Sequence, residues 1–153
     1  MPHVVAGLSG IVVGALFGAA MFCAMYFTKK YDSYNLDPQS RAGAFAPHLA
    51  RYLRAAEFTI GLATGSIVLL VGSSALHSQG GHLPWFYASP LILLAYCVLY
   101  GVAFMVSLIY GYEEVEHGNP HTDLAYALNQ TFGFSSLACF CVGYFWLVVT
   151  VTT

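Results

Sequence analysis

Charge is what this sequence has least of. Asp, Glu, Lys and Arg make up only 8% of its 153 residues, whereas a typical soluble domain has about a quarter. Hydrophobic residues account for 58% of the chain, and its mean hydropathy is +0.68. This composition excludes an ordinary soluble domain. We expect membrane lipids, and no nucleic acid, among its partners.

Long apolar runs take the place of charge. Four of them reach the roughly 20 residues that a helix needs to cross a hydrocarbon core. These runs cover about residues 4–28, 55–76, 85–110 and 124–151. The sequence therefore predicts an all-α membrane protein, organised as a single four-transmembrane-helix bundle over residues 1–153.

Positive charge is confined to one loop. The five basic residues all lie in or near the segment 29–54, between the first two predicted spans, and are Lys29, Lys30, Arg41, Arg51 and Arg54. The positive-inside rule places this basic loop on the cytoplasmic side or its equivalent. With four spans, both termini are then expected on the non-cytoplasmic side. The acidic loop 111–123 would share the side of the basic loop, as a solvated connector that could dock on it.

Metal- and cofactor-binding patterns are also missing. The four cysteines fall within predicted spans without a C-x-x-C motif, and are Cys23, Cys97, Cys139 and Cys141. No histidine falls inside a span, which disfavours a haem between the helices. One E-x-x-H motif, Glu114 to His117, occurs where a di-iron bundle needs two such motifs and two further glutamates. We therefore predict no metal and no cofactor.

Glycines recur at four-residue spacing in two predicted spans. They are Gly10, Gly14 and Gly18 in the first span, and Gly61 and Gly65 in the second. Such spacing lets another helix approach closely. The partner helix could belong to the same bundle or to another subunit in an oligomer, and both interpretations stay open.

One group of polar residues is expected near a single membrane boundary. The candidate ligand-binding residues are Arg51, Arg54, Glu57, Tyr110, Tyr112, Tyr126 and Gln130. The arginines could hold an anionic ligand or extend toward lipid headgroups. Arg54 and Glu57 could form an ion pair three residues apart, and the tyrosines could form an interfacial aromatic belt.

Four short stretches resemble one known family in their order and spacing. They are Lys29–Tyr31, Arg54-Ala55 within "RYLRAAEF", Tyr110–Tyr112, and the P-x5-Y-x-L-x-Q pattern of Pro120–Gln130. Together they resemble the membrane-associated proteins in eicosanoid and glutathione metabolism (MAPEG family), in particular the microsomal glutathione transferase 3 branch. The resemblance implies a four-span fold, a trimer and glutathione as cosubstrate.

The sequence departs from that family where glutathione is held. Phe58 and Gly61 stand at the asparagine and glutamate positions of its second-helix signature. The resemblance also implies an arginine near the third loop or fourth helix, since a thiol of pKa about 8.5 needs a nearby cation to ionise at neutral pH. No Lys or Arg follows Arg54, and the acidic loop carries Glu113, Glu114 and Glu116 instead. These departures argue against transferase activity and leave no catalytic residue to predict.

The sequence-based prediction of function is therefore a non-catalytic, MAPEG-like membrane protein. It would act as an accessory subunit of a membrane complex or as a homo-oligomer, with lipid binding. One alternative is a glutathione-dependent membrane transferase or peroxidase that uses Arg51, Arg54, Tyr110 and Tyr112. A second alternative is a small channel or transporter subunit. We expect an integral, multi-pass location in an endomembrane or organellar membrane, the mitochondrial one included.

Overall fold

The described part of the chain consists of four long helices. The computed structural model describes residues 2–28, 46–73, 85–119 and 122–152. Its helices are α1 (Pro2–Thr28), α2 (Ala46–Gly72), the short 3-10 helix η2 (Trp85–Tyr87), α3 (Ala88–Glu116) and α4 (Asp123–Thr152). All four α-helices are long and apolar enough to cross a membrane, and no strand occurs in these ranges. The predicted all-α architecture with four membrane-spanning helices is confirmed at this level.

Two helices extend beyond the predicted apolar runs. α2 begins at Ala46, nine residues before the predicted start of its span, and α3 continues to Glu116. An apolar run marks only the part of a helix that can lie in lipid. The helix itself continues as long as its residues favour helical backbone, and Ala, Leu, Arg and Glu all do. The first part of the predicted acidic loop, residues 111–116, is therefore helical, and its glutamates lie on α3. The basic residues Lys29, Lys30 and Arg41 lie outside the described residues.

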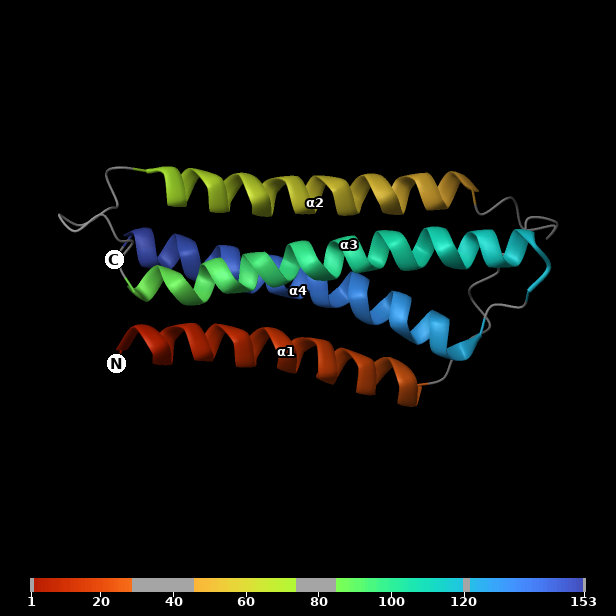
Figure 1. Ribbon diagram of the computed structural model, residues 1–153, viewed down its shortest axis with the longest axis horizontal. Coiled ribbons are helices and arrows are strands. Elements are labelled where there is room, and N and C mark those ends of the chain that lie inside the picture. The colour runs from red at the N-terminus through yellow and green to blue at the C-terminus, as the bar shows by residue number, and fades with distance from the viewer. Residues whose placement is uncertain (1, 29–45, 74–84, 120–121, 153) are drawn as a thin grey trace.

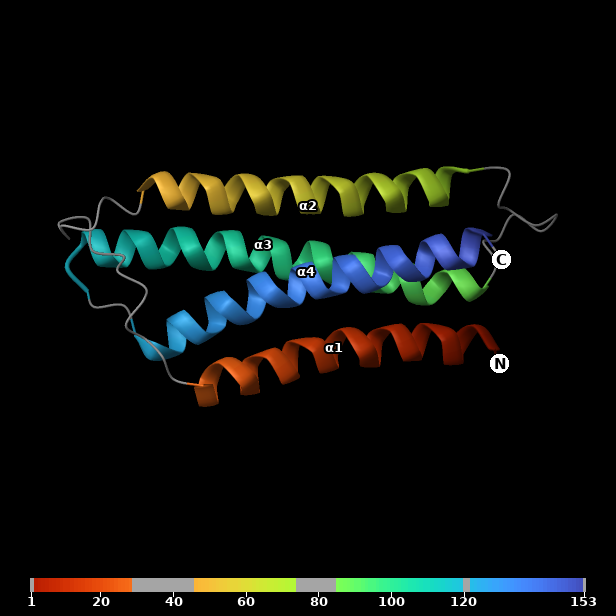
Figure 2. The same ribbon diagram turned by 180° about the vertical axis from the view of Figure 1, so that it is seen from behind.

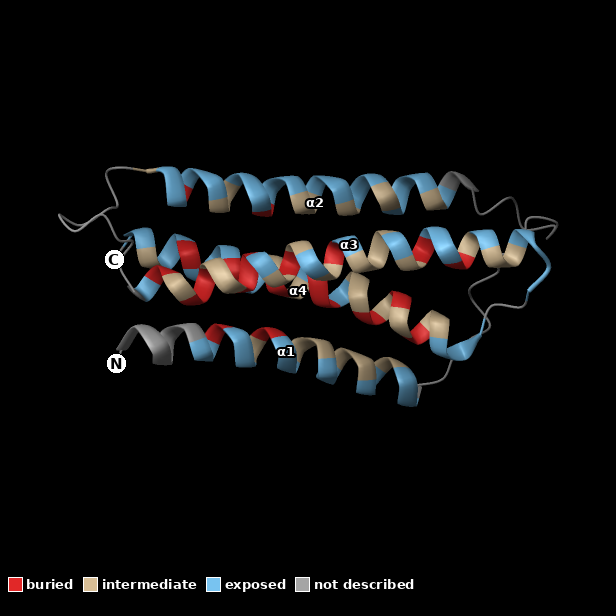
Figure 3. Ribbon diagram, in the orientation of Figure 1, coloured by how far each residue is buried: buried red, intermediate tan, exposed pale blue. Residues whose placement is uncertain are grey.

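α3 and α4 form the centre of the bundle (Figures 1 and 2). α1 and α2 flank this pair on opposite sides, and both chain ends lie at the same end of the bundle. α2 packs mainly against α3 and touches α4 much less, whereas α1 packs against both central helices. Buried residues accordingly gather where α3 and α4 face each other, as Figure 3 shows.

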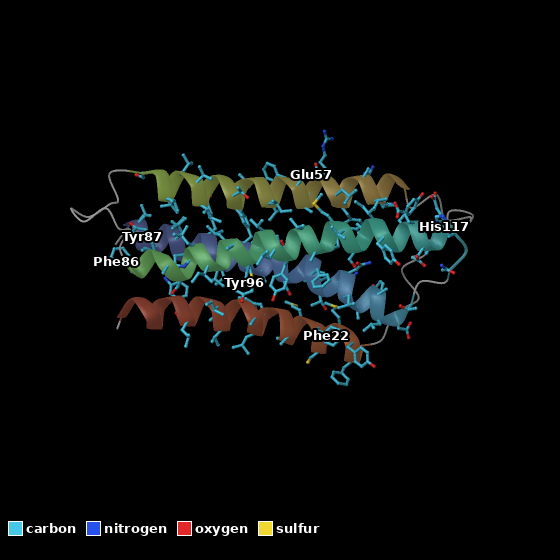
Figure 4. All side chains as sticks on the ribbon, in the orientation of Figure 1. Phe22, Glu57, Phe86, Tyr87, Tyr96 and His117 are labelled. Atoms are coloured by element: carbon cyan, nitrogen blue, oxygen red, sulfur yellow. The ribbon has the colours of Figure 1, made fainter. Side chains whose placement is uncertain are left out.

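The glycine stripe of α1 packs against α3. A Cβ atom at Gly14 would lie 2.4 Å from the Tyr96 ring, and one at Gly18 would lie 2.3 Å from the Tyr100 hydroxyl. The Tyr100 hydroxyl donates a hydrogen bond of 3.1 Å to the Gly14 carbonyl. The missing side chains thus make room for two tyrosine rings, and Tyr96 lies between α1 and α3 (Figure 4). Gly10 continues the stripe, where a Cβ would lie 3.1 Å from Ile92.

Serine and cysteine connect α3 to α4 at mid-bundle. The Ser136 hydroxyl donates a 2.8 Å hydrogen bond to the Cys97 carbonyl and lies 3.6 Å from the Cys97 thiol. All four cysteines are free: Cys97 and Cys139 are buried, whereas Cys23 and Cys141 are exposed. The outer surface of the helices is mostly apolar, with large exposed side chains such as Leu69 and Phe145, which suits a surface in contact with lipid.

Candidate functional site

A groove lies between α2 and α4, and residues of α3 also line it. Its volume is about 330 Å³, at the lower end of the range of ligand pockets, roughly 300–1,000 Å³. Gly101 and Phe104 of α3 line it from one side, and Gly133 of α4 lies against the Phe104 ring, where a Cβ atom would be 3.2 Å from the ring. The remaining lining residues are Tyr52, Ala55, Ala56 and Thr59 of α2, and Asn129, Gln130, Phe134, Ser136 and Leu137 of α4.

Asn129 and Gln130 give the groove one polar end. Asn129 is only 5% exposed, and its Oδ1 accepts a hydrogen bond from the Ser107 hydroxyl of α3. Within the described part of the chain, its amide nitrogen Nδ2 donates to no residue. The neighbouring Gln130 Nε2 donates to the Tyr126 hydroxyl at 3.3 Å. The groove is therefore lined by an amide whose nitrogen has no acceptor among the described residues.

The other end of the groove is apolar and faces outward. Phe134 and Leu137 are 47% and 51% exposed, so the wall from α4 is continuous with the outer surface of the bundle. The Ser136 and Thr59 hydroxyls are both committed to backbone carbonyls, of Cys97 and Ala55 respectively. In a bilayer, such an opening faces lipid rather than water.

Only part of the predicted polar group meets at this groove. Gln130 lines it, and Tyr126 is bonded to Gln130. Tyr110 and Tyr112 instead hydrogen-bond to Glu114 and Glu116, one turn further along their own helix. These two tyrosines do not line the groove.

The α2 charges lie on the exposed part of that helix. Arg51, Arg54 and Glu57 are all exposed, and Glu57 is labelled on α2 in Figure 4. The expected ion pair between Arg54 and Glu57 is not formed, and neither residue pairs with any other that the structure describes. Side chains three residues apart on a helix can each extend outward without meeting, and these two do.

The second pair of glycines differs from the first. A Cβ atom at Gly61 or Gly65 would meet nothing within 4 Å. These glycines therefore face away from the other helices of the bundle. They leave an open strip on α2, on the same helix face as Arg54 and Glu57.

The E-x-x-H motif lies at the end of α3, where His117 is labelled in Figure 4. His117 Nδ1 is hydrogen-bonded to the Glu113 carbonyl at 2.7 Å, and Asn119 Nδ2 donates to Glu114 Oε2 at 2.6 Å. These bonds close the C-terminal turn, which ends at Gly118 with a φ of 86°. No group of three metal-ligating side chains occurs in the ranges that the structure describes.

Sequence reasoning did not select Asn129 or Ser107 as site residues. Both interrupt otherwise apolar runs, and a buried amide within a span is itself a signal of function or helix contact. The contact between them joins two residues that are 22 positions apart and lie on different helices. Residue spacing along a single helix cannot reveal such a contact.

Comparison with protein-family models, curated proteins and solved structures gives no match for this chain. The MAPEG resemblance of the short stretches above therefore stays a prediction. Two of those stretches, Lys29–Tyr31 and the start of Pro120–Gln130, involve residues outside the described ranges.

Proposed function

We propose that the protein is a non-enzymatic membrane protein that binds an amphipathic lipid between α2 and α4. The observation that carries this proposal is the groove itself, which combines an apolar wall open to the outer surface with a buried amide at one end. A bilayer lipid has the same combination of a long apolar part and a short polar part.

Non-enzymatic binding is proposed because the groove has no candidate nucleophile or general base. Its polar side chains are hydroxyls and amides, without a carboxylate, imidazole or thiol. A glutathione-dependent enzyme would also need a cation beside the thiolate. The end of α3 has three glutamates and no basic residue in its last turn.

The proposal is tested by a substitution that fills the mouth of the groove. Ala55→Leu places a larger side chain among the lining residues, and we expect it to weaken lipid binding roughly tenfold, equivalent to about 1.4 kcal/mol. Ala50→Leu is the matched control, because Ala50 is exposed on the same helix and does not line the groove. The measurement is native mass spectrometry of bound lipid after purification in mild detergent. Equal lipid retention by both variants would contradict the proposal.

A second candidate role, as a self-associating membrane subunit, is favoured by the open strip of α2. Gly61 and Gly65 leave space for close helix approach, and small residues at such spacing drive helix association in membranes. Arg54 and Glu57 carry opposite charges beside that strip, and neither pairs with a residue in the described ranges. A second copy of the chain, in the same orientation, supplies the complementary charge for each. In mild detergent, the particle mass would then be twice the 16.5 kDa of the chain.

A further inference from the structure

We infer that the groove takes an acyl ester of a glycerophospholipid, whose carbonyl oxygen accepts a hydrogen bond from Asn129 Nδ2. This inference rests on the proposed lipid-binding function and specifies the chemistry of the ligand. It is carried by three features of the groove: an amide donor without an acceptor on a buried residue, the height of that residue in the bundle, and the apolar channel leading from it.

The first feature is the donor. Asn129 is 95% buried and lines the groove, and its Oδ1 accepts a hydrogen bond from Ser107, which leaves Nδ2 without an acceptor among the described residues. An amide donor in an apolar environment is costly to leave without an acceptor. A ligand that offers an acceptor, and needs no donor of its own, fits this position. An ester carbonyl has that property, whereas a hydrocarbon chain does not.

The second feature is the height of Asn129 along the bundle. Asn129 is bonded to Ser107, the residue before Leu108, and Leu108 packs against Leu53 of α2. Arg54 follows Leu53, so the buried amide lies at about the level of the exposed arginine. Charged side chains of membrane helices extend toward the interface. Asn129 therefore lies near the boundary between hydrocarbon and headgroups, where the ester groups of a phospholipid are located.

The third feature is the channel from Asn129 to Leu137. Eight residues of helix correspond to about 12 Å at 1.5 Å per residue, and this stretch leads away from the charged end of the bundle. Its lining becomes apolar at Phe134 and Leu137. A volume of about 330 Å³ is too small for a whole phospholipid, so the groove takes only part of one acyl chain. The headgroup then remains at the mouth, where Arg51 lies one helical turn before Ala55 and can approach a phosphate.

The test uses the unaltered protein with two lipids that differ only in the carbonyl. Diacyl phosphatidylcholine has ester carbonyls, and dialkyl phosphatidylcholine of the same chain length has ether oxygens instead. We expect the diacyl lipid to bind roughly 3- to 20-fold more tightly, the range for hydrogen bonds between polar groups in membranes. Binding is measured by native mass spectrometry with each lipid added in turn to delipidated protein.

Two variants test whether the Asn129 amide causes the preference for the diacyl lipid. Asn129→Leu should bind both lipids equally, because leucine is similar in size to asparagine and has no donor. Thr131→Val, a polar-to-apolar change at another buried position of α4 that does not line the groove, should retain the preference for the diacyl lipid. Loss of the preference in both variants would overturn the inference.

The outcomes also separate this inference from the proposed function. Equal binding of the diacyl and dialkyl lipids, or tighter binding of a free fatty acid than of either, would overturn the ester inference and leave a lipid-binding groove. Absence of binding by all three, together with no effect of Ala55→Leu, would overturn the proposed function as well.

Discussion

At the scale of single residues, the same glycine spacing has two different outcomes. Gly14 and Gly18 accommodate tyrosine rings of α3, whereas Gly61 and Gly65 face open space. The spacing predicts a surface that another helix can approach. It contains no information on which helix does so, because that depends on residues such as Tyr96 more than 80 positions away.

This contrast gives a matched pair of substitutions. In Gly14→Ala, the added Cβ would lie 2.4 Å from the Tyr96 ring, so the ring must move and the α1–α3 contact must open. We expect a loss of about 1–3 kcal/mol, as for other overpacked positions, measured as a lower thermal midpoint in detergent. Gly61→Ala introduces no contact and favours helix, so its midpoint should stay equal or rise. A similar loss in both variants would contradict the packing of α1.

At the scale of elements, α3 is longer than the membrane requires. Its 29 residues correspond to about 44 Å, against roughly 30 Å of hydrocarbon. The sequence predicted the apolar part of this helix, because hydropathy measures affinity for lipid. It did not predict the last turn, because glutamate is polar and yet a good helix former.

The excess length places negative charge at the wrong end of the α3 dipole. The last turn has three glutamates and no basic residue, whereas a helix C-terminus favours cations by about 0.3–1 kcal/mol each. Glu113 is exposed, so Glu113→Lys should stabilise this turn. The expected readouts are slower amide hydrogen exchange at the end of α3 and a slightly higher thermal midpoint, both reduced by high salt.

The N-terminal end of the next helix, α4, provides the control for that change. Asp123 lies in the first turn of α4, where a negative charge is favourable. Asp123→Lys should therefore destabilise the N-terminal turn of α4, although the charge change is the same. If both substitutions shifted stability in the same direction, net charge would be the cause, and the dipole argument would be wrong.

At the scale of the whole molecule, the position of α2 at one edge of the bundle gives the proposed self-association a specific test. Arg54→Glu and Glu57→Arg should each weaken the dimer, because each puts like charges opposite each other in a two-fold symmetric pair. The double variant exchanges the two charges and should restore the dimer. The particle mass in mild detergent is the measurement. A trimer, or a dimer indifferent to both single changes, would contradict association through this face.

Some features of the whole molecule follow from the sequence, and others do not. Four apolar runs were enough to predict four membrane-length helices, because crossing lipid imposes length and composition on each helix separately. The groove depends instead on how three helices face one another. Gly101, Asn129 and Ala55 come from different helices, and no pattern within one span records their proximity. Sidedness, read from the positions of the basic residues, stays a prediction.

The one-sided packing of α2 has a consequence for cooperativity. An element held on a single side opens at a lower free-energy cost than the core it rests on, so α2 is the helix most readily detached from the bundle. A lipid bound in the groove, as proposed, would touch α4 as well as α2 and add to the small direct contact between these two helices. Bound lipid would therefore raise the free energy of local opening of α2. The opening of this helix would be rarer in the lipid-bound protein than in the delipidated one.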